Sequence, residues 1–365
     1  MRCLFLAPLK PPDDAVPSGD RTIARGLMAA LGQVGFRVEL ASRLRMRLAT
    51  GEPAELAGLQ AAAAGELARL RAAEAGRAKP AMVFAYHVYH RSPDLIGPAL
   101  AAGLGVPYVL AEAARSPRHA TGRFAEGYRL AAAAIDSAAL VFAATSNDRV
   151  VLDRLRPPGQ RVVDLRPFLD LADWPAVARA PHAGAVRLLA VAMMRAGDKA
   201  ASYAQLAAAL VPLAGLDWTL DVVGDGPAAA AVQAGFAPFG GRVRFLGEVA
   251  QAALPAVYAA ADLLVWPAVN EAFGMVFLEA QSQSVPCIAG GHGSVGDAIL
   301  GGRTGRIVPA DDVAAFSAAL AAAIGDPGLR AGWAAAARPF VAGQRSLAAA
   351  VPVLREALAE VGVRA

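Results

Sequence analysis

The chain has 365 residues, which is too many for a single compact core and fits about two domains. It is 56% hydrophobic and 18% charged, which excludes a disordered protein, and its net charge of +4 gives no reason to expect nucleic acid as a partner. No run of about 18 strongly apolar residues occurs, and the apolar start of the chain stops at Pro11 and Pro12 without a small-residue cleavage site. We therefore expect a cytoplasmic protein.

Short strand-like runs alternate with longer alanine-rich helical stretches, a pattern that predicts parallel α/β layers. In residues 1–168, which we expect to form one Rossmann-like domain, the predicted strands are 2–8, 36–40, 81–84, 107–110 and 139–144. The predicted helices of this half are 20–31, 54–76 and one that begins near 123.

Three prolines, at 167, 175 and 181, interrupt this alternation, and we interpret residues 169–183 as a linker. Beyond it, strands are predicted at 186–192, 218–223, 243–246, 263–266 and 285–289, with helices near 199–213, 226–235, 251–260 and 275–284. This pattern predicts a second Rossmann-like domain over 184–342, followed by a helix within 343–365 that packs back on the first domain. Two such domains are expected to face each other across a ligand cleft, outside the carboxyl ends of their strands.

The two cysteines, Cys3 and Cys287, lie inside apolar strand-like runs. Free cysteine is among the most buried residue types, so we expect two buried thiols without a redox or metal role.

Two glutamates, Glu271 and Glu279, flank a possible helix start at Gly274. The first amides of such a helix, at Gly274 and Met275, can bind an anion, and nearby carboxylates suit a ligand that has hydroxyls as well as phosphates. A sugar nucleotide has both. The spacing alone, however, favours an acidic pair beside an ordinary helix start.

Residues 187–279 hold four motifs in order: Arg195 with Lys199, GDGP at 224–227, FLG at 245–247, and the segment 271–279 with its two glutamates around Phe273 and Gly274. In this order and spacing they closely resemble the second domain of retaining glycosyltransferases of the GT-B fold, family 4. The segments 289–293 and 303–309 continue the resemblance. It implies an α/β protein of GT-B architecture that transfers a sugar from a nucleotide-diphosphate sugar with retention of configuration.

The resemblance also implies roles for single residues. Arg195 and Lys199 would bind the donor diphosphate, and Glu271 would hold hydroxyls of the donor sugar. Further donor-binding residues implied are Gly19, Gly224, Gly226, Gly247, Val249, Phe273, Gly274, Met275 and Glu279, the last toward the ribose. No Asp-x-Asp triplet occurs in the chain, so we expect the two cations to replace a metal, and no cofactor besides the donor substrate.

The first domain matches the family less closely. The segment 17–20 resembles the family's glycine loop, but Asp20 stands where glycine is usual and could cap the following helix. His87 resembles a strand-end histidine of the family and is a candidate on the acceptor side. Where relatives carry a further histidine after the strand 107–110, this chain has Glu112, so either Glu112 or His119 is expected to take that role. His87 and His90 lack a nearby Cys or Asp in the sequence, so no metal site is expected.

The sequence does not identify the acceptor, and three classes are considered: a small molecule, a glycan and a lipid-linked acceptor. Arg43, Arg45 and Arg47 form a basic run that fits a solvated loop better than a contact with an acceptor phosphate or a membrane surface. A peripheral contact with the inner membrane face therefore remains an option. Asp170, in a segment that resembles the family's interdomain junction, is expected to be structural.

Three functions other than sugar transfer are compatible with parts of the sequence. A nicotinamide-dependent enzyme is suggested by G-x-G-x-x-A at 224–229 and by Glu248, but Asp225 puts a carboxylate where pyrophosphate would bind and Pro227 removes an amide. A sugar-nucleotide epimerase of the same fold would be distinguished by its product. A non-catalytic sensor would bind the donor without transfer or hydrolysis.

Overall fold

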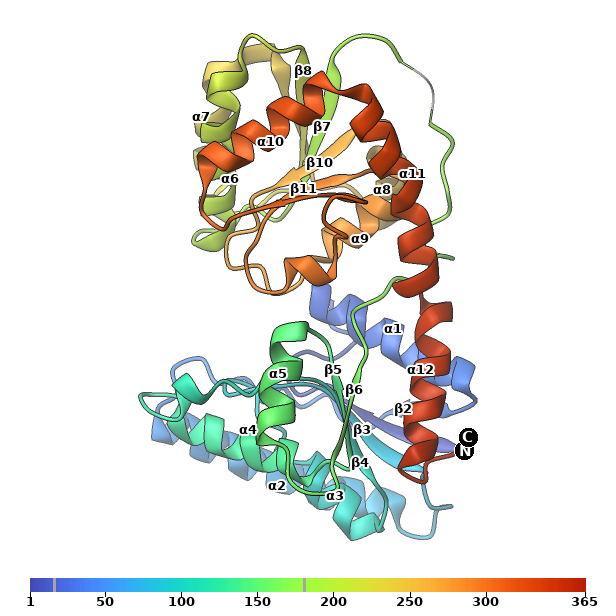
Figure 1. Ribbon diagram of the computed structural model, residues 1–365. Coiled ribbons are helices and arrows are strands. Elements are labelled where there is room, and N and C mark those ends of the chain that lie inside the picture. Colours follow the sequence, from blue (N-terminus) through green and yellow to red (C-terminus); the bar gives the residue numbers. More distant parts are fainter. Residues whose placement is uncertain (16–17, 180–181) are drawn as a thin grey trace. The chain divides into compact units, whose positions relative to one another are not determined.

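A computed structural model describes residues 1–15, 18–179 and 182–365 (Figure 1). The chain divides into unit 1, Met1–Pro167 with Leu347–Ala365, and unit 2, Phe168–Ser346. Each unit is built on one parallel six-stranded sheet, which confirms the predicted α/β class with two Rossmann-like sheets. Pro17 and Pro181, which the sequence analysis assigned to the glycine loop and to the linker, lie outside the described residues.

The sheet of unit 1 has the strand order β2-β1-β3-β4-β5-β6. Its strands are β1 (Arg2–Leu6), β2 (Arg37–Leu40), β3 (Met82–Val88), β4 (Tyr108–Ala113), β5 (Leu140–Ala143) and β6 (Arg161–Asp164). Its helices are α1 (Gly19–Val34), α2 (Pro53–Glu74), α3 (Gly97–Leu104), α4 (Ala125–Ser137), α5 (Ser146–Leu155), α12 (Leu347–Glu360) and the short 3-10 helix η1 (Pro117–His119). The C-terminal helix α12 packs against α1, while α2, α3 and α4 pack together on the other face (Figure 1).

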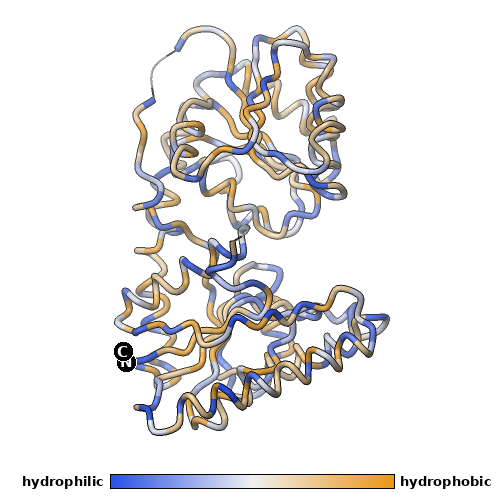
Figure 2. Tube along the Cα trace, turned by 180° about the vertical axis from the view of Figure 1, so that it is seen from behind, coloured by the Kyte–Doolittle hydropathy of each residue, from blue (hydrophilic) through white to orange (hydrophobic). Residues whose placement is uncertain are grey.

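Strands β3 and β4 extend further than the sequence predicted, because burial continues to Val88 and Ala113 at their ends. Glu112 therefore lies inside β4 and not in a loop after it, which corrects the expectation. Hydrophobic and hydrophilic residues are mixed along the long helix α2 (Figure 2). The residues that it buries are Leu56, Ala63, Leu70 and Glu74, which lie seven, seven and four positions apart and so on one side of the helix.

The sheet of unit 2 has the order β12-β11-β10-β7-β8-β9. Its strands are β7 (Val186–Val191), β8 (Trp218–Val223), β9 (Val243–Gly247), β10 (Leu263–Trp266), β11 (Cys287–Gly290) and β12 (Gly305–Val308). Its helices are α6 (Asp198–Leu210), α7 (Ala229–Phe236), α8 (Leu254–Ala260), α9 (Met275–Ser282), α10 (Val313–Gly325) and α11 (Pro327–Gln344). Four 3-10 helices join them: η2 (Val211–Leu213), η3 (Ala237–Arg242), η4 (Gln251–Ala253) and η5 (Val295–Asp297).

The described part of the predicted linker packs along unit 2. The Leu169 amide donates to the Arg345 carbonyl at 2.8 Å, and the buried Trp174 ring lies 5.8 Å from that of Tyr258. Asp170 accepts a hydrogen bond from the Ala172 amide, a local turn contact. These contacts show that the segment packs on unit 2. The predicted domain limits stay a prediction.

Both cysteines are free and fully buried, as predicted. Burial in apolar surroundings raises the pKa of each thiol, so neither is a reactive thiolate. Within the described residues, no helix is both long enough and apolar enough to cross a membrane.

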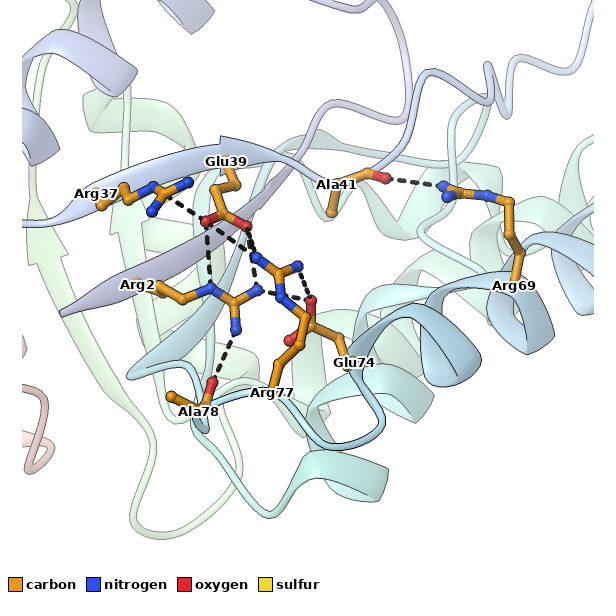
Figure 3. Close-up of polar contacts among 8 residues, drawn as sticks. All are labelled: Arg2, Arg37, Glu39, Ala41, Arg69, Glu74, Arg77 and Ala78. Carbon is orange, nitrogen blue, oxygen red and sulfur yellow. Dashed lines mark hydrogen bonds and ion pairs between the residues drawn. The ribbon is translucent and has the colours of Figure 1, made fainter.

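An ion network that the sequence analysis missed lies at the amino end of β1 (Figure 3). Arg2 bonds Glu74, at the end of α2, at 2.6 Å and Glu39, in β2, at 3.1 Å; Arg77 reaches Glu74 at 2.8 Å. The hydrogen bond from Arg2 lowers the pKa of Glu39. The network ties α2 to the edge of the sheet, at the end of β1 away from its carboxyl terminus.

Candidate functional site

The strand orders locate one candidate position in each sheet. Order reverses between β7 and β10 in unit 2, and between β1 and β3 in unit 1. In open parallel sheets, ligands bind beyond the carboxyl ends of the strands beside such a reversal. In unit 2, the segments that follow these two strands carry Arg195, Lys199 and Glu271.

Lys199 and Glu271 come together although 72 residues separate them. The Lys199 ammonium, in the first turn of α6, forms an ion pair with the carboxylate of Glu271, in the loop before α9. The same ammonium lies 5.6 Å from the ring centroid of Trp266, the buried last residue of β10. Two of the residues that the resemblance assigned to the donor thus lie in contact, and Trp266 supports the cation by a contact that the sequence did not indicate.

The loop that carries Glu271 is strained and tied to α6. Ala268 and Asn270 have φ values of 60° and 53°, a left-handed conformation that non-glycine residues rarely adopt. The Val269 amide donates to Ser202 Oγ at 3.0 Å, and Asn270 Nδ2 donates to Asp198 Oδ1 at 3.2 Å. Strained backbone held by its surroundings is typical of ligand-binding sites, and here it fixes the segment before Glu271 on the helix that carries Lys199.

Arg195 precedes α6 in the loop after β7 and is exposed. Within residues 1–15, 18–179 and 182–365, its guanidinium has no hydrogen-bond or ion-pair partner. Its five N–H donors are therefore available to an anion, in the fork geometry that suits two phosphate oxygens.

Helix α9 begins directly after Gly274, as the sequence predicted. Gly274, which precedes the helix, has φ +85°, and a Cβ there would lie 2.5 Å from the Phe277 ring, so only glycine fits. The first amides of a helix have no intrahelical acceptor, which leaves that of Met275 open to a ligand. Phe273 is buried, so its contribution to a ligand would be from the backbone.

Glu279 lies about one turn inside α9 and is half-buried. Burial raises the pKa of its carboxyl group, while a hydrogen bond of 2.7 Å from the Tyr258 hydroxyl opposes the rise. The predicted ribose contact would use the second carboxylate oxygen, since Oε2 is taken by Tyr258.

The structure explains why positions 224 and 226 require glycine, which the sequence alone did not reveal. Both have positive φ, and a Cβ at either position would overlap the carbonyl oxygen of Ala192 or Met194. The GDGP loop thus lies directly on the loop after β7, and the Met194 amide donates to the Asp225 carbonyl at 2.9 Å. These glycines support the backbone next to Arg195.

The same loop argues against a nicotinamide site. The Gly226 amide donates to the Asp225 side chain at 2.7 Å, so the carboxylate already occupies a donor that pyrophosphate would need. Gly247, with φ 68°, accepts the Gly224 amide at 2.8 Å, and the half-buried Val249 packs against the core.

In unit 1, His87 lies between two carboxylates at the reversal of strand order. Its Nδ1 is 2.9 Å from Asp20 Oδ1 and 3.4 Å from Glu112 Oε1, so the acidic partners that its sequence neighbours do not supply come from α1 and β4. Asp20 is not the helix cap either, because Ser18 Oγ accepts from the Arg21 amide at the start of α1. Gly19 is the first residue of that helix and has open space on its Cβ side.

The charges in this cluster shift two pKa values. Burial alone would lower the pKa of His87, but Glu112 and Asp20 raise it to about 9. Burial raises the pKa of Glu112, and the positive charge of His87 opposes the rise. Both residues have left-handed backbone, with φ of 61° and 57°. Within the part of the chain that the structure describes, Glu112 Oε2 is buried and forms no hydrogen bond.

His119 lies elsewhere, stacked on His90 with 3.6 Å between ring centroids. Glu112 and His119 were the two candidates for the position where relatives carry a histidine, and Glu112 is the one in contact with His87.

In the basic run, Arg43 pairs with Asp13 and Arg45 with Asp14. Among the described residues, no group of three or more His, Cys, Asp or Glu side chains could hold a metal ion.

Comparisons with known proteins agree with the motifs of unit 2. Residues 185–326 match the family described as glycosyl transferases, group 1. D-inositol 3-phosphate glycosyltransferase from Salinispora arenicola is 37% identical over 123 residues, which cover 33% of this chain and 28% of that protein. Glycogen synthase from Mycobacterium tuberculosis H37Rv is 28% identical over 194 residues, which cover 53% and 47%. The chain thus spans less than half the length of either relative.

Solved structures extend the likeness of fold to both units. Sucrose-phosphate synthase from Thermosynechococcus elongatus has a TM-score of 0.75 at 17% identity, over 99% of each chain. The Anabaena protein HepE in complex with UDP-glucose has a TM-score of 0.70 at 17% identity, over 99% of this chain and all of that one. Residues 185–326 thus match the group 1 glycosyltransferases, and the fold of the two units is the GT-B fold of these solved structures.

Proposed function

We propose that this protein transfers a sugar from a nucleotide-diphosphate sugar to an acceptor, with retention of configuration and without a divalent metal. The observation that carries the proposal is the ion pair of Lys199 and Glu271 at the reversal of strand order in unit 2. Arg195 lies in the loop before the helix of Lys199, and its guanidinium has no partner among the described residues. Two cations and the start of α9 suit a diphosphate, and a carboxylate suits sugar hydroxyls.

The two cations stabilise the leaving group. As the glycosidic bond breaks, negative charge collects on the departing nucleoside diphosphate, and preorganised cations stabilise it without reorganisation. The Lys199 ammonium has three N–H donors, so it can keep its bond to Glu271 and still donate to a phosphate oxygen. Arg195 supplies a fork to two oxygens. This assignment, with the missing Asp-x-Asp triplet, is why we propose transfer without a metal.

Retention rests on the resemblance to the family, in which the acceptor attacks from the leaving-group face and a donor phosphate oxygen takes its proton. We assign Glu112, held by His87, to orient a hydroxyl of acceptor or donor. A carboxylate that acted as general base on the opposite face would instead give inversion. Glu112→Gln is therefore expected to slow transfer without changing the product's configuration.

Two further observations bear on the donor base and on the compartment. HepE, which has the same fold, was solved with UDP-glucose, so uridine nucleotides are the first to test. The buried, unpaired Cys3 and Cys287 suit a reducing compartment, which supports a cytoplasmic reaction.

The test has two steps. Thermal shifts with uridine, guanosine, adenosine and thymidine diphosphates identify the base, since a ligand at a hundred times its Kd stabilises a protein by about 2.7 kcal/mol. Proton NMR of the first product from the matching donor, in excess EDTA, is then expected to show retained anomeric configuration. An inverted product, or activity lost in EDTA and restored by magnesium, would contradict the proposal. An epimerised donor without transfer would favour the epimerase.

A further inference from the structure

Three loop segments of unit 1 meet at the buried ring of Phe124. They are the segments that hold Leu48, Arg91 and Phe124 itself. The Leu48 amide donates to the Arg91 carbonyl at 2.7 Å, and Arg91 Nε donates back to the Leu48 carbonyl at 3.3 Å. Phe124 packs with Leu48 and Leu56 in a small hydrophobic cluster apart from the main core. Side chains that leave these segments therefore have fixed starting points.

Each of the three segments contains at least one arginine. The guanidinium carbons of Arg91 and Arg123 lie 5.1 Å and 4.7 Å from the Phe124 ring centroid. Arg118 Nε donates to His119 Nε2 at 3.2 Å, and Arg47 precedes Leu48. We call these residues, with His90, the Arg/His cluster: Arg47, His90, Arg91, Arg118, His119 and Arg123.

The positive charges of the cluster lack counter-ions. Among the residues that the structure describes, none of its four arginines pairs with a carboxylate, whereas Arg43, Arg45 and Arg129 nearby in the chain all do. Glu55, in the first turn of α2, accepts hydrogen bonds from the amides of residues 49, 50 and 51. Arg91 and Arg123 lie over the same ring and repel each other, so a bound anion would relieve this repulsion.

The cluster also contains the stacked, uncharged rings of His90 and His119. Their rings stack at 3.6 Å with an angle of 12°, and burial, together with the charges of His119, Arg91 and Arg118, lowers the pKa of His90 to about 4. Because His119 Nε2 accepts from Arg118, its proton is on Nδ1, which makes that atom a hydrogen-bond donor.

We propose that the Arg/His cluster binds a phosphate group of the acceptor. Several guanidiniums on one small surface suit a dianion better than a single carboxylate, because each can form paired N–H···O bonds to phosphate oxygens. The term acceptor rests on the proposed function, but the binding of phosphate does not. The phosphate could belong to a water-soluble acceptor or to a lipid headgroup, and the experiment separates these sources.

The test measures binding of inorganic phosphate to the full chain by proton–carbon NMR of the histidine rings. Phosphate is expected to shift the His90 and His119 signals in the wild type. The double variant Arg118→Ala, Arg123→Ala should bind it about tenfold or more weakly, since a hydrogen bond to a charged group contributes about 1.5–3 kcal/mol. Arg129→Ala, an exposed arginine already paired with Glu126, is the matched control and should bind like the wild type.

Two further arms make the result decisive. Arg195→Ala with Lys199→Ala should leave the phosphate-induced shifts of His90 and His119 unchanged; their loss in this variant alone would move the anion to the donor site and overturn the proposal. Co-sedimentation with phosphatidylcholine vesicles, with and without phosphatidylglycerol, identifies the source. Phosphate binding with or without vesicle binding supports the proposal, and vesicle binding without phosphate binding refutes it. Nucleoside diphosphate affinity, measured on the same proteins, tests the proposed function separately.

Discussion

The two histidines His87 and His90 are three residues apart in sequence, and we expect them to titrate far apart. His87 is held between Asp20 and Glu112 and should have a pKa of about 9, whereas His90, beside cations, should have one of about 4. The side chain of His87 is only 18% exposed, so solvent screens these carboxylates little. An increase from the ordinary 6.5 to about 9 corresponds to about 3 kcal/mol in favour of the charged ring.

The sign of the effect on stability follows from the raised pKa. The stabilisation of unit 1 by charged His87 is complete below pH 6.5 and is lost as pH rises through about 9. All four tryptophans lie in unit 2, so far-UV circular dichroism rather than tryptophan fluorescence should follow unfolding of unit 1. His87→Gln should remove most of this pH dependence.

The direct assay is an NMR titration of the five histidine rings, assigned by single substitutions. Glu112→Gln should lower the pKa of His87, because the charge of Glu112 is the strongest of the effects that raise it. A His87 pKa at or below 6.5, or one that Glu112→Gln leaves unchanged, would refute the assignment of a charged imidazole between two carboxylates.

Two further predictions concern unit 2. Gly224→Ala should lower its free energy of unfolding by about 3 kcal/mol or more, because φ is +135° and the new Cβ meets the Ala192 carbonyl; Gly235→Ala, with open space around it in α7, should be neutral or stabilising. Urea unfolding followed by tryptophan fluorescence compares the two, and equal stability would contradict the packing argument. Glu279→Ala should weaken nucleoside diphosphate binding in calorimetry, whereas Glu271→Ala should mainly reduce turnover; equal losses of affinity would contradict this division.

Periodicity was sufficient to predict most strands. The predicted strands 218–223 and 263–266 match β8 and β10 residue for residue, because each is a buried run between turn residues. Strands β6 and β12 were missed; each has four residues, an exposed arginine and too little apolar character to stand out. Helix α5 was missed for a related reason, since it buries only Leu152.

The site required more than periodicity. Nothing in the spacing of Lys199 and Glu271 predicts their contact, and only the family resemblance suggested it before the strand order placed β7 beside β10. In unit 1, Asp20 and His87 meet because β1 lies beside β3, a neighbourhood that local sequence does not encode. Sequence analysis therefore assigned Asp20 a local role as a cap and missed its long-range one.

The central claim is that Arg195 and Lys199 hold the diphosphate of a nucleotide donor. Calorimetry of the nucleoside diphosphate that binds the wild type best, repeated on Arg195→Ala and Lys199→Ala, tests it most directly. Because a hydrogen bond to a charged group contributes about 1.5–3 kcal/mol, we expect each variant to bind about tenfold or more weakly, with an unchanged circular dichroism spectrum. Wild-type affinity in both variants, or failure of all four nucleoside diphosphates to bind the wild type, would contradict the claim.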